Sequence, residues 1–287
     1  MKITPIAFDS FGVRSEATFV ETKDVKILID GSAALGPLRY SLPPHPLELK
    51  QLDRLLKAIR KYAEKSDVII VSHFHYDHYA PDEPELFENK IALIKHPKEN
   101  INRSQYKRAC EFIPKIEKIV KRLEFADNRE FKFGETKVKF SPAVWHGNVG
   151  SKLGYVIMSS IDDGRQKFLH GSDAQGVIVD ETANWMIREN PDIMVIDGPP
   201  LLFVGWRMGK KVIEKSIKND IRILEETKVK TVIFDHHVVR DLKYKEKMKK
   251  LFDRAEELGK NIMTAAEFVG KKPNFLEARR KELYEKY

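Results

Sequence analysis

The alternation of apolar and polar positions divides the chain into strands and helices. The first thirty residues predict a small β-meander, with strands at Lys2 to Phe8, Ala17 to Glu21 and Val25 to Asp30. A helix follows, because apolar residues recur at helical spacing at Leu52, Leu55, Leu56, Ile59, Tyr62 and Ala63. It leads into the apolar run Val68 to Val71, which is typical of a buried strand.

The later part of the chain continues this alternation. The segment Asn100 to Leu123 predicts one or two helices. Strands are expected at Glu130 to Phe133, Thr136 to Phe140, Gly154 to Ser159, Gln166 to Leu169, Ile193 to Ile196 and Lys230 to Phe234. Helices are expected around Ile213 to Leu224 and Tyr244 to Leu258. Helices that bracket two mostly β halves, with no Pro/Gly/Ser-rich linker, predict one layered α/β domain over residues 1–287.

Composition narrows the class of protein. The chain has 287 residues, of which 42% are hydrophobic, so it can bury a substantial core. Its longest apolar runs fall far short of the ~20 residues that cross a bilayer, and Met1 to Gly12 lacks the apolar run of a signal peptide. The single cysteine, Cys110, excludes an internal disulfide and a cysteine-based zinc site. We therefore expect a cytoplasmic protein with no membrane partner, and the scarcity of Gln and Cys among many Lys and Glu suits a heat-adapted one.

Positive charge is concentrated in one segment. The formal net charge is +8, and the stretch from Lys95 to Arg122 contains nine basic residues and three acidic ones. A small anionic substrate or a nucleic acid would be attracted there, although long lysines on a solvated helix face produce the same pattern. The helical basic stretch, about residues 97–125, is also a candidate lid over a site.

The candidate chemistry lies where strands end. The strand Val68 to Val71 runs into four potential metal ligands within six residues, namely His73, His75, Asp77 and His78. Three further expected strands lead to His146, to Asp173, and to His236 with His237. Imidazole and carboxylate groups suit Zn, Fe or Mn. These donors are numerous enough for two metal ions.

The order of these ligands resembles a known family. The motif HxHxDH at positions 73 to 78, followed by His146, Asp173 and a histidine at 236 or 237, is similar to the ligand set of the metallo-β-lactamase-fold hydrolase superfamily. The resemblance implies an αββα sandwich with the metals at one edge, between two sheets. The runs Phe234 to Asp241 and Gly198 to Pro200 also resemble a mainly archaeal branch of that superfamily.

The resemblance implies a role for each ligand. His73, His75 and His146 would hold the first metal, while Asp77, His78 and the last histidine would hold the second, with Asp173 bridging. Asp30 matches an early aspartate that supports the site. In relatives the last ligand follows one polar residue after the strand, and Asp235 occupies that place, so His236 is favoured as the ligand. His237 would then either support the ligands from behind or face the substrate.

The expected activity follows from this ligand set. Two divalent ions, Zn in first place with Fe or Mn as alternatives, would share a bridging hydroxide that attacks an anionic ester, lactone or phosphodiester. Asp77 would bind metal and orient the nucleophile, and His237 or His170 would protonate the leaving group. Arg14, Ser15 and Arg240 are candidates for binding an anionic group, with a purely structural role equally open.

Two other functions share the motif. A mononuclear iron dioxygenase of the persulfide type also carries HxHxDH but uses only two histidines and one aspartate, and a nuclease or nucleic-acid-binding protein would use the basic segment. Asp173 and His236 lie only 63 positions apart, too close for the second domain of β-CASP nucleases. His146 and Asp173 lie 27 positions apart, too close for the RNA arm of tRNase Z-like enzymes. Retention of every second-metal ligand favours the dinuclear hydrolase.

Overall fold

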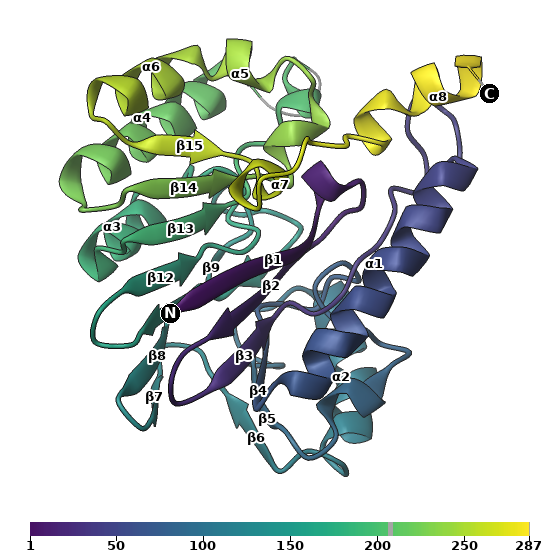
Figure 1. Cartoon of the computed structure of the whole chain (residues 1–287), viewed down its shortest axis with the longest axis vertical. Helices are drawn as coiled ribbons and strands as arrows, with labels where there is room; N and C mark the ends of the chain where they lie inside the picture. The colour runs from purple at the N-terminus through teal and green to yellow at the C-terminus, as the bar shows by residue number, and fades with distance from the viewer. Residues whose placement is uncertain (206–208, 287) are drawn as a thin grey trace.

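The computed structural model, which describes residues 1–205 and 209–286, has two β-sheets packed face to face with helices on both outer sides (Figure 1). The strands of the first sheet, in spatial order, are β1 (Lys2–Phe8), β2 (Glu16–Glu21), β3 (Lys26–Ile29), β4 (Val68–Val71), β5 (Ile91–Ile94) and β6 (Arg122–Phe125). Its first three strands are antiparallel, and β3 to β6 run parallel. The chain therefore crosses over the outer face of this sheet to reach each parallel strand.

The second sheet mirrors this plan. Its strands, in spatial order, are β15 (Asn261–Met263), β14 (Thr231–Phe234), β13 (Ile193–Ile196), β12 (Lys167–His170), β11 (Ser159–Asp162), β8 (Thr136–Phe140) and β7 (Glu130–Phe133). Strands β12 to β15 are parallel, and the others are antiparallel. A separate short pair joins β9 (Val144–Trp145) to β10 (Tyr155–Val156).

Helices cover both outer faces (Figure 1). The first sheet carries α1 (Pro46–Lys65) and α2 (Arg103–Ile116), whereas the second carries α3 (Asp180–Glu189), α4 (Lys210–Glu226) and α6 (Lys249–Glu257). The remaining helices are α5 (Tyr244–Lys247), α7 (Ala265–Phe268), α8 (Arg280–Lys286) and the 3-10 turns η1 (Asp9–Phe11), η2 (Pro84–Phe87), η3 (Leu201–Phe203), η4 (Val238–Arg240) and η5 (Glu277–Arg279). The αββα sandwich predicted from the sequence is confirmed.

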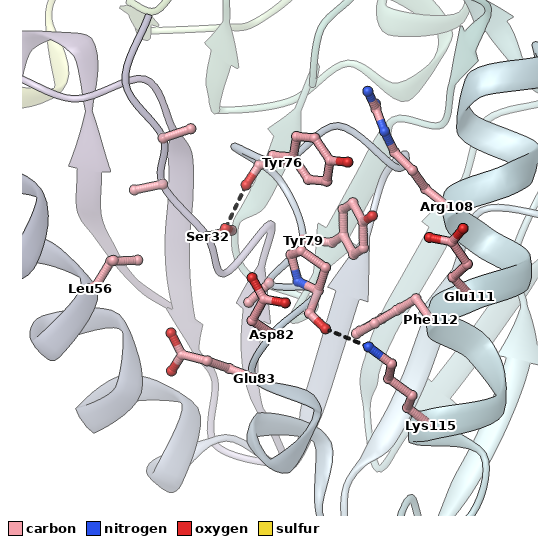
Figure 2. A pocket seen from close by; sticks show the side chains of 14 residues that line it. Ser32, Leu56, Tyr76, Tyr79, Asp82, Glu83, Arg108, Glu111, Phe112 and Lys115 are labelled. Atoms are coloured by element: carbon pink, nitrogen blue, oxygen red, sulfur yellow. Dashed lines mark hydrogen bonds between the residues drawn. The ribbon is translucent and has the colours of Figure 1, made fainter. Parts of the chain in front are cut away.

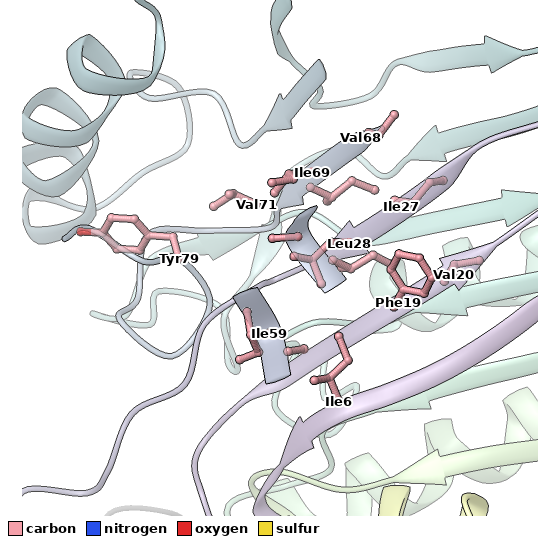
Figure 3. Packing of buried hydrophobic residues seen from close by; sticks show 14 of the residues in the cluster. Ile6, Phe19, Val20, Ile27, Leu28, Ile59, Val68, Ile69, Val71 and Tyr79 are labelled. Carbon is pink, nitrogen blue, oxygen red and sulfur yellow. The ribbon is translucent and has the colours of Figure 1, made fainter. Parts of the chain in front are cut away.

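Apolar side chains fill the space between the sheets and beneath the helices. All four residues of β4 are buried, because the opposite sheet covers one face and helices cover the other. Figure 3 shows Ile59 of α1 facing Leu28 and Ile6 of the first sheet, within one buried cluster. A fully buried side chain of this size contributes about 1.5–3 kcal/mol, so this packing holds the strand ends in place.

The helical structure predicted for Asn100 to Leu123 is wrong after residue 116. Only Arg103–Ile116 is helical, and the chain then re-enters the first sheet as β6. Ala109, Phe112 and Ile116 bury one face of α2, which therefore forms part of the outer layer. That the basic stretch, about residues 97–125, acts as a lid over the metals stays a prediction.

Two other predicted elements are interrupted. The expected strand Gly154 to Ser159 breaks between β10 and β11, where Ile157 N–H donates to the Ser72 carbonyl at 3.1 Å and ties the chain to the other sheet. The expected helix Tyr244 to Leu258 divides at Met248, which is fully buried and departs from helical geometry. Among the described residues, no helix combines the length and apolar character needed to cross a bilayer.

Candidate metal centre

The candidate ligands lie on turns at one edge of the sandwich. Asp30 follows β3, the segment His73 to His78 follows β4, Asp173 follows β12 and His236 follows β14. Because these strands are parallel within each sheet, their carboxyl ends lie at a common edge. Several turn residues adopt left-handed backbone angles, with φ of 49° at Asp30, 52° at Ser172 and 80° at His236. Such strain persists where surrounding structure holds a functional geometry.

The first group of ligands is His73, His75, His146 and Asp173, whose ligand atoms lie within 4.8 Å of one another. His146 Nε2 lies 3.2 Å from His75 Nδ1 and 3.1 Å from Asp173 Oδ2. His73 Nε2 lies 3.6 Å from the same oxygen and has no hydrogen-bond partner among the described residues. Three imidazole nitrogens and one carboxylate oxygen match the donors that zinc prefers.

The second group is Asp77, His78 and His236. His78 Nε2 lies 3.1 Å and His236 Nε2 3.3 Å from Asp173 Oδ1. Asp77 Oδ2 lies 3.7 Å from His236 Nε2. The side chain of Asp77 is 18% exposed while both histidines are fully buried, so the centre opens to solvent near Asp77.

Asp173 joins the two groups. Its Oδ2 faces His73 and His146, while its Oδ1 faces His78 and His236. Within the described chain, Oδ1 and the Nε2 atoms of His73 and His78 are buried without a hydrogen-bond partner. Buried polar atoms are nearly always paired, so this convergence of unpaired donors fits two cations.

Neighbouring groups anchor the ring nitrogens that face away from the centre. Asp30 Oδ2 lies 2.9 Å from His78 Nδ1, and its carboxylate also accepts from the Ser72 N–H and hydroxyl. Asp9 Oδ2 lies 2.7 Å from His236 Nδ1. A carboxylate on the far nitrogen fixes the tautomer and leaves Nε2 as the ligand atom. The structure thus places Asp30 in the supporting position that the resemblance implies.

Arg240 lies beside the second group. Its Nε donates to Asp9 Oδ1 at 2.8 Å, and its Nη2 lies 3.1 Å from His236 Nε2. Of the candidate anion-binding residues, Arg240 is the one with a contact to a ligand histidine. Arg14 instead pairs with Glu277 at 2.6 Å, and the Ser15 hydroxyl donates to the Ser32 carbonyl.

His237 also lies within reach of the centre, because one of its ring nitrogens is within 4.8 Å of ligand atoms of Asp173 and His236. Its Nδ1 lies 2.8 Å from Asp197 Oδ2, and its Nε2 lies 3.4 Å from the Gln175 amide nitrogen. Its ring centroid is 6.0 Å from that of His146. His170 is buried at the end of β12, where its Nε2 lies 3.0 Å from the Glu16 carbonyl. His237 therefore lies beside the ligands, and His170 lies behind them.

Burial and nearby charges shift the pKa values of the candidate ligands in different directions. Burial, together with the neighbouring His146, lowers the pKa of His75 to about 3. Burial opposes ionisation of Asp77, but His78 and His236 outweigh it and lower its pKa to about 2. Burial and Arg240 oppose protonation of His236, yet Asp173 and Asp9 raise its pKa to about 10. The negative charge that holds a proton on His236 would equally attract a cation.

Four residues that the sequence analysis did not single out contribute to the centre. They are Asp9, Glu16, Gln175 and Asp197. Asp197 directly follows β13 and Gln175 follows Asp173 by two positions, so the rule that active groups follow strand ends could have found both. Asp9 and Glu16 lie on either side of the first loop and are brought in only by the tertiary fold.

A cavity of about 490 Å³ lies beside the ligand turn, between α1 and α2. Figure 2 shows Tyr76, which separates the ligands His75 and Asp77, with its carbonyl accepting from the Ser32 hydroxyl. The Arg108 guanidinium lies 4.3 Å from the centre of the Tyr76 ring. Lys115 also lines this cavity, so basic groups of α2 reach the neighbourhood of the centre.

Comparison with known proteins agrees with the fold. A sequence model described as the beta-lactamase superfamily domain matches residues 26–237, which contain the whole set of ligands. The chain belongs to this superfamily. A UPF0282 protein of Methanocaldococcus jannaschii is 45% identical over 294 residues, covering 99% of this chain and 96% of the relative. A UPF0282 protein of Pyrococcus abyssi is 46% identical over 296 residues, covering 99% and 92%. The predicted likeness to an archaeal branch is confirmed, and the chain is a UPF0282 member of the superfamily.

Solved structures repeat the architecture at low identity. The metallo-beta-lactamase fold protein YhfI from Bacillus subtilis aligns with a TM-score of 0.54 and 16% identity over 95% of this chain and 96% of that chain. An isothiocyanate hydrolase from Delia radicum gut bacteria aligns with a TM-score of 0.56 and 15% identity over 92% and 95%. At this identity the likeness concerns the fold alone.

Proposed function

We propose that this UPF0282 protein is a dinuclear metal-dependent hydrolase that acts on a small anionic ester, lactone or phosphodiester. The observation that carries the proposal is the position of Asp173, with one carboxylate oxygen facing His73 and His146 and the other facing His78 and His236. A single cation would need only one of these groups. Two complete groups that share a carboxylate are the arrangement of two-metal sites.

Each proposed cation would be held by its own set of residues. When bound, a pair of divalent cations, with zinc as the first choice, would supply a water of lowered pKa and polarise the oxygen under attack. His73, His75, His146 and Asp173 would hold the first cation, and Asp77, His78, His236 and Asp173 the second. Asp77, the partly open ligand, would also orient the attacking water.

His237 is the proposed proton donor to the leaving group. In the tautomer that carries its proton on Nδ1, His237 donates to Asp197. Its Nε2 is then unprotonated and lies beside Gln175, towards the centre. Burial and the nearby Arg240 lower the pKa of His237 well below its usual value, so the ring would hold a proton at Nε2 only while passing it to the leaving group. His170 is less suited to this role, because its Nε2 is engaged by the Glu16 carbonyl.

The cavity beside Tyr76 carries charges of both signs. Arg108 and Lys115 line the cavity beside Tyr76. Glu83, an acidic residue of the same cavity, is paired with Arg60 through contacts of 2.5 and 2.9 Å. Asp82 and Glu111 also line the cavity, so the cavity itself does not select for an anion. The anionic class of substrate rests on the excess of basic residues between Lys95 and Arg122.

The proposal is tested by metal content and by hydrolysis. Purified protein is expected to hold two transition-metal ions per chain and to hydrolyse members of a panel of phosphodiesters and lactones. His73→Ala and Asp173→Ala are expected to lower this activity by at least about a thousandfold, because each removes a ligand of the reacting centre. Cys110→Ala, a change at an exposed residue on α2, is the matched control and should keep full activity.

Two outcomes would contradict the proposal. One iron per chain, with oxygen consumption on persulfide substrates, would establish the mononuclear dioxygenase. A nuclease would instead be established by two results together. Binding of RNA or DNA would weaken steeply with salt and be lost when Lys107, Arg108 and Lys115 are neutralised, and the protein would cleave nucleic-acid strands but none of the small substrates.

A further inference from the structure

The side-chain carboxylate of Glu16 is fully buried, and both of its oxygens lack a hydrogen-bond partner among the described residues. The residue lies at the start of β2. Its backbone carbonyl accepts from the Thr18 hydroxyl and lies 3.0 Å from His170 Nε2. An unpaired buried carboxylate costs several kcal/mol, so a compensating partner is expected.

The side chain points to the second ligand group. A carboxylate oxygen of Glu16 lies within 4.8 Å of ligand atoms of both His78 and Asp173. Of the ligand atoms of these two residues, His78 Nε2 and Asp173 Oδ1 are buried, lie 3.1 Å apart and make no hydrogen bond within the described part of the chain. Burial raises the pKa of Glu16 well above its usual value, while the nearby His236 opposes that rise. Buried polar atoms of Glu16, His78 and Asp173, which lie in or next to three different strands, therefore come close enough together to share a cation.

Resting on the proposed function, we propose that Glu16 is an additional carboxylate ligand of the second cation. This cation would then have three carboxylates, from Asp77, Asp173 and Glu16, beside His78 and His236. The first cation has three histidines and one carboxylate. Oxygen-rich sites of higher coordination number favour Mn²⁺ or Fe²⁺, whereas a nitrogen-rich tetrahedral set favours Zn²⁺. The two sites are therefore unlike, and the second prefers the harder metal.

The test compares metal binding by Glu16→Gln and by the wild type. Both full-length proteins are stripped with a chelator, given equal Zn²⁺ and Mn²⁺, and analysed for metal content and for the Mn²⁺ electron paramagnetic resonance signal. Wild-type protein is expected to hold one Zn²⁺ and one Mn²⁺. In the variant, Mn²⁺ affinity should fall by about a hundredfold or more and the Zn²⁺ of the first site should remain.

Thermal unfolding separates a ligand from a structural residue. Glutamine has nearly the same shape and carries no charge, so the metal-free variant should unfold at the same or a higher temperature than the metal-free wild type. The increase in Tm caused by adding Mn²⁺ should shrink, because binding stabilises only in proportion to affinity. Glu21→Gln, at the other end of β2, is the matched control and should change neither quantity.

Each result has one meaning. Two ions in the wild type, with unchanged metal content, selectivity and Mn²⁺ signal in Glu16→Gln, would overturn the role of Glu16 and leave the dinuclear hydrolase standing. A metal-free variant with a lower Tm and unaltered Mn²⁺ affinity would show that Glu16 is structural. A wild type with fewer than two ions would refute the proposed function itself.

Discussion

Buried carboxylates orient two of the candidate ligand histidines through the ring nitrogen that points away from the centre. The outward nitrogens of His78 and His236 face Asp30 and Asp9, so each ring keeps one nitrogen for a cation. Asp9 also holds Arg240, so a single carboxylate orients a ligand and a guanidinium together. The precision of the centre therefore depends on residues that would not touch a metal themselves.

Asp9→Asn tests this support at the scale of one residue. The amide is uncharged and can turn its NH2 group towards His236 Nδ1, so it no longer fixes the tautomer of the ring, and the affinity for the second cation is expected to fall by about 10–100-fold. Competitive titration with a chromogenic chelator measures this affinity. The first cation serves as the internal reference, because its ligands make no contact with Asp9 in the described structure; equal weakening of both sites would contradict the prediction.

At the scale of elements, α4 supports the turn that carries Asp173. The consecutive residues Gln175, Gly176 and Val177 all have positive φ, which is rare for a β-branched valine. Asn219 of α4 donates to the Val177 carbonyl at 2.9 Å, and the Ser216 hydroxyl donates to the Gly176 carbonyl. The polar side of α4 thus holds this turn in a backbone conformation that it would not adopt by itself.

Asn219→Ala is expected to lower the free energy of unfolding by about 1–3 kcal/mol, because the buried carbonyl of Val177 loses its donor. Denaturant unfolding measures this change. A lower affinity for both cations should accompany it, since Asp173 joins the two ligand groups. Lys218→Ala, at an exposed position of the same helix, is the control and should cost less than about 0.5 kcal/mol; equal losses in the two variants would argue against a special role for Asn219.

At the scale of the whole molecule, the C-terminal segment closes the structure against its N-terminal half. Glu277 pairs with Arg14, and the fully buried Arg280 pairs with Glu48 at the start of α1. Burial opposes ionisation of Glu277, but Arg14 outweighs it and lowers the pKa of Glu277 from 4.5 to about 2. Arg14, a candidate for anion binding from sequence, is used here to join distant parts of the chain.

This ion pair predicts how stability depends on pH. A carboxylate with a lowered folded pKa adds stability that is complete above its unfolded pKa and is lost as pH falls from about 4.5 towards 2. Glu277→Gln should therefore cost about 3 kcal/mol at pH 7, and this difference from wild type should shrink below pH 4.5. Urea unfolding at several pH values measures it. Glu282→Gln, at a neighbouring exposed position, should cost little at any pH; a pH-independent loss in Glu277→Gln would exclude the ion pair as the cause.

Local pattern was sufficient for most elements and for the ligands nearest in sequence. The helix at 46–65 and the strand at 68–71 follow from spacing alone, and the motif at 73–78 supplies four ligands from one turn. Pattern was insufficient where tertiary contacts override it. Residues 122–125 became an edge strand and the segment 244–258 divided at a buried methionine, because pairing and packing partners come from elsewhere in the chain.

The spacing of apolar residues predicts a layered α/β arrangement, and the chemistry of the donors predicts which metals suit them. The resemblance to the superfamily added the sandwich, the sharing of Asp173 and the preference for His236. Neither could supply Asp9 and Glu16, which lie on either side of the first loop and come next to the ligands only in the folded chain. Such pairings join residues separated by up to 227 positions, and no local pattern encodes a contact over that distance.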